Sequence, residues 1–353
     1  MTTQVATVWD AVIGQPTAVR RLQASAVSPL HAYLFVGPPG SSKNEAARAF
    51  AARLMSAGDD PSVRAARLAL NGEHPDVREV MRVGPAISAE QADDIVRMAS
   101  LAPTEGNRKV MILHEFHLIN PMAAAKLLKT IEEPPGNTVF IVLADHMPAD
   151  LVTIASRCIR IDFVPVSNDV VAATLRAEGV GADRALEAAT AAQGDLTRAR
   201  LLATDPNLAA RRELFATTPM RLDGTGRNVV QAVEALLGAI DDAAAPLALR
   251  HAAEVTALEE RIAAMGERGS GKKALEERHK RELRRHRTDE LRAGLATLAG
   301  AYRDALVAGT LPRPDAAALA VTRIHLALEA LERNPNEPLL LQALLLELPP
   351  LRR

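Results

Sequence analysis

Short apolar runs alternate with amphipathic stretches through the first half of the chain. The apolar runs are brief, rich in branched side chains and bounded by polar or turn residues, which predicts buried parallel strands. We expect these strands at residues 32–37, 109–115, 138–144 and 159–163. Helical patterns lie between them at residues 44–56, 89–102 and 120–133. This alternation predicts a doubly wound α/β domain with a parallel sheet over residues 1–165.

The strand pattern stops after Pro165. Three short helical patterns predict a small three-helix domain over residues 166–206, with helices at residues 169–178, 182–193 and 197–203. Residues 207–353 are expected to form an all-α domain. Its predicted helices include residues 243–265, 272–307, 314–333 and 338–348.

Composition adds little about partners. The 353 residues contain 42 Lys and Arg against 43 Asp and Glu, so any nucleic-acid contact must come from a local patch. A basic helix at residues 278–287 is such a patch, and it is either a solvated face or a surface that faces DNA or a partner. The single Cys158 excludes an internal disulfide, and no apolar run reaches the roughly 20 residues of a membrane span. We therefore expect a cytoplasmic protein without membrane association.

The segment GPPGSSKN resembles a phosphate loop, because it follows the first predicted strand directly and opens a helix. In such loops backbone N–H groups bind phosphates, a lysine reaches the β- and γ-phosphates, and a hydroxyl ligates Mg²⁺. Ser42 replaces the second glycine of the pattern, and Asn44 replaces the hydroxyl residue. The candidate nucleotide-binding residues are Gly37, Gly40, Ser41, Ser42, Lys43 and Asn44.

The second long apolar run ends in a degenerate acidic motif. His114 stands where a magnesium-positioning Asp is expected, and Glu115 stands at the catalytic Glu position. Because Mg²⁺ prefers hard oxygen ligands and carries much of phosphoryl-transfer catalysis, we expect no independent ATP hydrolysis. Two alternatives remain for the phosphate-loop segment. It either still binds ATP or ADP through Lys43, or it is only a packed remnant of the fold. A transition-metal site at His114 is disfavoured, since no second His lies at ligand spacing, and no metal is predicted.

Several further motifs occur in the order found in one family. They are GEHPDV at 72–77, PTEGNRKVMIL at 103–113, AAAKLLKTIEEPP at 123–135, GNTVFIVLA at 136–144 and Ser156-Arg157-Cys158. Together they resemble the clamp-loader ATPases of the AAA+ family over about the first 165 residues. The resemblance implies an AAA+ domain followed by a helical lid and a collar. Lys126, Lys129, Glu132 and Glu133 are expected to be helix-surface charges.

An intact Ser156-Arg157-Cys158 beside a degenerate phosphate loop resembles the delta-prime subunits of bacterial DNA polymerase III. Residues 298–307 and 327–348 are similar to the collar of these subunits, particularly the actinobacterial type. The resemblance implies that Arg157 is an arginine finger for the ATP site of a neighbouring gamma/tau subunit. The alternative is that Arg157 pairs with a local carboxylate. Ser156 and Cys158 support the motif, with Cys158 packed beneath the loop.

The same resemblance implies a set of partners. These are the delta and gamma/tau subunits, and, through the complex, the beta sliding clamp and primer-template DNA. Two other functions stay open: an active ATPase of the gamma/tau type, and a paralogous AAA+ subunit outside replication.

The chain departs from the family at three places. The usual zinc-binding cysteines are missing, with Val63 and Ala66 near their positions, so zinc is expected to be absent and a helix with hydrophobic packing to replace it. Asp145 follows the third long apolar run where an ATPase has Thr or Asn near the γ-phosphate. Arg198 lies one residue from the register of the second-sensor arginine. The last two departures also argue against hydrolysis.

Overall fold

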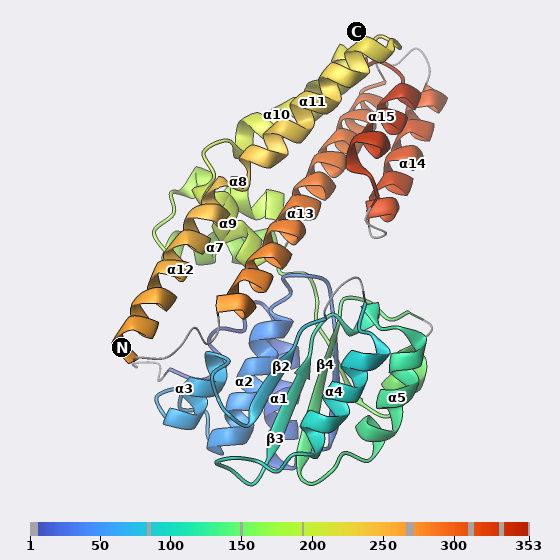
Figure 1. The fold of residues 1–353 in the computed structure, drawn as a ribbon. Helices are drawn as coiled ribbons and strands as arrows, with labels where there is room; N and C mark the ends of the chain where they lie inside the picture. The colour runs from blue at the N-terminus through green and yellow to red at the C-terminus, as the bar shows by residue number, and fades with distance from the viewer. Residues whose placement is uncertain are drawn as a thin grey trace. The chain divides into compact units, whose positions relative to one another are not determined.

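The computed structural model describes residues 6–82, 86–148, 151–192, 194–265, 272–309, 314–331 and 335–351. The chain forms two compact units, residues 1–199 and residues 200–353 (Figure 1). The division into three domains at residues 165 and 206 stays a prediction.

A five-stranded parallel sheet is the centre of the first unit, which confirms the predicted α/β class. The strands are β1 (Ala32–Val36), β2 (Val77–Val80), β3 (Lys109–Leu113), β4 (Thr138–Ala144) and β5 (Ile159–Asp162), in the order β2-β3-β4-β1-β5. Every residue of β1, β3 and β4 is buried, as expected for parallel strands covered on both faces.

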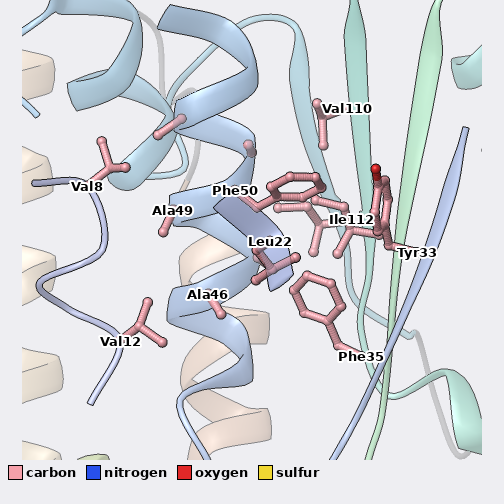
Figure 2. Packing of buried hydrophobic residues seen from close by; sticks show 14 of the residues in the cluster. Val8, Val12, Leu22, Tyr33, Phe35, Ala46, Ala49, Phe50, Val110 and Ile112 are labelled. Atoms are coloured by element: carbon pink, nitrogen blue, oxygen red, sulfur yellow. The ribbon is translucent and has the colours of Figure 1, made fainter. Parts of the chain in front are cut away.

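Helices cover the sheet on both sides (Figure 1). Besides the 3₁₀ turn η1 (Phe116–Leu118), they are α1 (Pro16–Val27), α2 (Lys43–Ser56), α3 (Arg64–Leu70), α4 (Ala89–Ser100), α5 (Pro121–Glu132) and α6 (Val152–Ala155). Alternate residues of β1 enter different cores, so Tyr33 packs with α1 and α2 whereas Leu34 packs with α4 and α5. Figure 2 shows Phe50 of α2 close to Leu22 of α1 and to Ile112 and Tyr33 of the sheet. The Tyr33 and Phe50 rings meet edge to face with centroids 4.7 Å apart.

Apart from one-residue differences at the ends of β1 and β5, the sheet differs from the sequence prediction at two strands. The edge strand β2 was missed because Val77–Val80 is short and contains two charged residues, Arg78 and Glu79. Strand β3 ends at Leu113, and the expected extension to residue 115 is wrong. Glu115 has a φ of 50°, in the left-handed region, which no strand residue adopts.

The described residues after β5 are mostly helical, as predicted. After β5 come α7 (Asn168–Ala177), α8 (Ala182–Ala192) and α9 (Leu196–Thr204). The second unit contains α10 (Leu208–Arg221), α11 (Gly226–Asp242), α12 (Ala245–Met265), α13 (Lys272–Val307), α14 (Pro314–Ala330) and α15 (Glu337–Glu347). Its core includes Phe215, Leu236, Leu295, Tyr302 and Ile324. Among the described helices, none is both long and apolar enough to cross a membrane.

A buried group of charges joins helices in the second unit. Arg211 of α10 donates to Asp205 at 2.6 Å and to Glu290 of α13 at 2.7 Å. All three side chains are at most 4% exposed. Charges buried this deeply are tolerated only when they neutralise one another.

Replacing Arg211 with Leu should therefore destabilise the second unit by about 3–5 kcal/mol, because two buried carboxylates lose their cation. Urea unfolding followed by far-UV circular dichroism measures the change. Arg221→Leu, at the exposed end of the same helix, is the matched control and should have little effect. Equal losses in the two variants would contradict the prediction.

Candidate phosphate-loop and arginine sites

The phosphate-loop segment has the conformation that its sequence suggested. Strand β1 ends at Val36, the loop follows, and α2 begins at Lys43. Gly40 has a φ of 69° and Ser42 a φ of 59°. Ser42 thus keeps the left-handed backbone of the glycine it replaces, at a cost of about 1 kcal/mol.

The Lys43 ammonium is held by groups of the chain itself. Its Nζ lies 2.7 Å from Oδ1 of Asp145, the residue that follows β4, and donates to the Pro38 carbonyl at 3.0 Å. The Lys43 side chain is only 7% exposed. The lysine ammonium that reaches phosphate in an active loop is therefore already engaged.

Asp145 is fixed in turn by His117 of η1. The Asp145 backbone N–H donates to His117 Nδ1 at 3.1 Å, and His117 Nε2 lies 3.6 Å from Asp145 Oδ2. Burial lowers the pKa of His117 and outweighs the opposing effect of the Asp145 charge. His117 is thus a neutral support for Asp145 at physiological pH.

Asp195, the residue before α9, lies against the loop. A Cβ placed on Gly40 would be 2.1 Å from the Asp195 Cα, so only glycine fits at position 40. The Ser41 hydroxyl is buried and has no hydrogen-bond partner within the described residues.

The position expected for a metal-binding Asp has become part of a structural network. His114 Nε2 lies 3.0 Å from Oε2 of Glu79 on β2, and Glu79 accepts two hydrogen bonds from Arg48 of α2, at 2.6 and 3.1 Å. Burial raises the pKa of Glu79, but hydrogen bonds from His114 and Arg48 outweigh it and lower that pKa to about 2. The network ties α2 to β2 and β3.

The other expected magnesium determinants do not compensate. Glu115 pairs with Arg82 at 2.9 Å, and Asn44 is exposed on the first turn of α2. Among the residues that the structure describes, no group of three or more His, Cys, Asp or Glu is arranged to hold a metal ion. The donors present at this site do not fit a Mg²⁺-nucleotide.

Arg157 lies at the surface between α6 and β5, with its side chain 32% exposed. Its Nε donates to Glu132 of α5 at 2.8 Å, and its Nη1 donates to the Thr153 carbonyl at 2.8 Å and to Ser156 Oγ at 3.3 Å. Nη2 has no hydrogen bond within the described part of the chain. Arg157 therefore has the local carboxylate that the sequence left as an alternative, and still has donors for a further anion.

Ser156 and Cys158, the other residues of the motif, and the more distant Arg198 are all engaged within the chain. Cys158 packs against the α4 and α5 core, where burial raises the pKa of its thiol to about 12. The Ser156 hydroxyl donates to the Thr153 carbonyl at 2.8 Å. Arg198 Nη1 donates to the Ala191 carbonyl at 2.6 Å.

The segment without zinc ligands forms α3, as predicted. Val63 precedes this helix, while Ala66 is fully buried in the core that α3 shares with α2. Hydrophobic packing thus holds the segment, and the absence of zinc stays a prediction.

Two sequence motifs meet through one buried carboxylate. Asp76 of GEHPDV accepts backbone N–H groups of Thr104, Glu105 and Gly106 in the PTEGNR segment, two of them at 2.9 Å. Although burial raises the pKa of Asp76, these hydrogen bonds lower it below its usual range. Asp76 therefore ties the segment before β2 to the loop before β3, and the two motifs have a structural explanation.

The basic helix lies in α13, and its charges are partly neutralised. Arg287 donates to Glu337 at 2.6 Å and also pairs with Asp241, while Arg278 pairs with Glu254. Whether this helix faces DNA stays a prediction.

Sequence reasoning missed Arg48, Glu79 and His117. The pairing of Lys43 with Asp145 was also missed, although the sequence held one signal for it. The acidic Asp145 follows a strand predicted to lie in the same sheet as the strand before Lys43. Arg48 and Glu79 carried no such signal, since β2 itself was not recognised.

The strand order, with a phosphate-loop segment directly after β1, defines an α/β P-loop domain of the AAA+ type. Residues 14–167 match the family described as DNA polymerase III, delta subunit. The chain is 37% identical over 138 residues to the delta-prime subunit of Pseudomonas aeruginosa, which covers 37% of this chain and 42% of that protein. Residues 14–167 are therefore similar to clamp-loader subunits of DNA polymerase III, and the resemblance of this part of the chain to delta-prime subunits is confirmed.

Other clamp-loader subunits match as well. The delta-prime subunit of Bacillus subtilis is 31% identical over 140 residues, covering 38% of this chain and 43% of that protein. The tau subunit of the same organism is 32% identical over 170 residues, covering 46% of this chain and 30% of that protein. The chain thus spans less than half the length of each of these relatives.

The Glu79 network predicts a dependence of stability on pH. The pKa of Glu79 falls from its ordinary 4.5 to about 2 on folding. The contribution of the ionised Glu79 to the free energy of unfolding is therefore complete above pH 4.5 and is lost as the pH falls towards 2. This shift corresponds to on the order of 3 kcal/mol. The stability difference between wild type and Glu79→Gln should narrow by that amount between pH 5 and pH 2.

The single Trp9, buried in the α1 and α2 core, reports unfolding of the first unit by fluorescence. Glu73→Gln, which changes an exposed carboxylate, should follow the wild-type pH dependence. A constant difference between wild type and Glu79→Gln across this pH range would rule out the proposed linkage.

Proposed function

We propose that this chain is a non-hydrolysing, delta-prime-type subunit of the DNA polymerase III clamp loader. The observation that carries the proposal is a contrast between two cations. Lys43 is buried and paired with Asp145, whereas Arg157 is at the surface with unused donors. The first arrangement does not suit hydrolysis at this chain's own loop, and the second suits contact with a neighbour's phosphates.

In this proposal Arg157 acts as an arginine finger in an adjacent gamma/tau subunit. A planar guanidinium offers several N–H donors in a fixed arrangement that suits phosphate oxygens. Glu132 and the Thr153 carbonyl hold one side of the group, so less side-chain freedom is lost when it meets a phosphate. Such an arginine supplied in trans stabilises the charge that develops during phosphoryl transfer.

The proposed assembly contains delta and gamma/tau subunits and acts in the cytoplasm. It would use the ATP bound by gamma/tau to place the beta sliding clamp on primer-template DNA. No cofactor is required by this chain.

Reconstitution with delta and gamma/tau tests the arginine finger. Arg157→Ala should lower the DNA- and clamp-stimulated ATPase rate by about 10³-fold, the lower end of the effect known for such arginines in GTPases. Arg160→Ala is a matched control, because Arg160 is a half-exposed arginine on β5 that pairs with Asp162. It should leave the rate unchanged. Equal rates for the Arg157→Ala and wild-type complexes would refute the assignment.

The similarity to tau favours one rival, an active ATPase of the gamma/tau type. The purified chain alone would then turn over ATP, and Lys43→Ala would abolish the turnover. Failure to assemble with delta and gamma/tau would instead favour a paralogous AAA+ subunit outside replication.

A further inference from the structure

We propose that Asp145 is an internal anion that occupies the phosphate-binding position beside Lys43 and so keeps nucleotides out of the loop. The proposal concerns the chain's own loop and does not depend on the role of Arg157. It rests on two observations: the backbone has the conformation of a phosphate loop, but the side chains around it do not fit a Mg²⁺-nucleotide.

Charge is the first argument. The Lys43 ammonium is nearly buried, and its neighbours at 2.7 and 3.0 Å are the Asp145 carboxylate and the Pro38 carbonyl. A phosphate that approaches Nζ must either displace this carboxylate or lie beside it. Both events are unfavourable, since displacement breaks a largely desolvated ion pair and coexistence brings like charges together.

Positioning is the second argument. Asp145 needs no rearrangement to pair with Lys43, because its backbone N–H is already bound to His117 Nδ1 and β4 lies directly beside β1. A carboxylate that the fold holds in place competes with an external phosphate without losing the freedom of a diffusing ligand.

The surroundings strengthen the exclusion. Asp195 lies against Gly40 and adds a second acidic residue next to the loop. In active phosphate loops a metal ion offsets the phosphate charge. Here the residue at the metal position, His114, is engaged with Glu79, which is itself bound by Arg48.

The test is binding of ATP and ADP to the full-length chain without divalent metal, measured by isothermal titration calorimetry. Asp145→Asn keeps the size of the side chain and the backbone N–H but removes the charge. It should bind both nucleotides at least about tenfold more tightly than wild type. Adding Lys43→Met to Asp145→Asn should return the affinity to the wild-type level, because the gain requires the released ammonium.

Asp162→Asn is the matched control, since this half-exposed carboxylate lies at the end of β5, the other neighbour of β1, and pairs with Arg160. It should bind nucleotides like wild type. Trp9 fluorescence and thermal unfolding establish that each variant is folded, and Asp145→Ser carries the same expectation if the Asn variant is not. The proposal is overturned if folded Asp145 variants bind no more tightly than wild type. It is equally overturned if the gain survives Lys43→Met.

Discussion

A buried cation at the carboxyl edge of the parallel sheet requires a negative partner, and this requirement shapes the first unit. The loop between β1 and α2 brings the Lys43 ammonium and the N-terminus of α2 to one place, and both favour an anion. In an active P-loop ATPase nucleotide phosphates meet that demand. In this chain the Asp145 carboxylate lies against the Lys43 ammonium and meets that demand from within the fold.

The same constraint explains the neighbouring network. Arg48 is five residues after Lys43 on α2 and is paired with Glu79, which also binds His114. A network of this kind is stable only when each buried polar group is satisfied. His114 stands where a metal-binding carboxylate was expected, and its ring nitrogen lies 3.0 Å from Glu79 Oε2. Together with Arg48, this contact joins α2 to β2 and to the end of β3.

The sequence was sufficient for the α/β class because β1, β3 and β4 are apolar at nearly every position. It was insufficient for β2, where Arg78 and Glu79 interrupt the apolar pattern of an edge strand. The candidate residues were identifiable from motif spacing. The same spacing showed that Ser42, Asn44 and His114 differ from the residues expected in an active ATPase. Their partners were not, since contacts such as Lys43 to Asp145 depend on strand order, which periodicity does not encode.

Carboxylates near the two cations have different consequences. Asp145 faces an ammonium that is 7% exposed, so water does little to weaken that pair. Glu132 is half exposed and meets an Arg157 side chain that is itself 32% exposed, so solvent screens the attraction. A competing phosphate can therefore be accommodated at Arg157 far more readily than at Lys43. One domain can thus hold both a phosphate loop closed by its own carboxylate and an arginine open to an external phosphate. Burial strengthens the Lys43–Asp145 pair, whereas exposure weakens the Arg157–Glu132 pair.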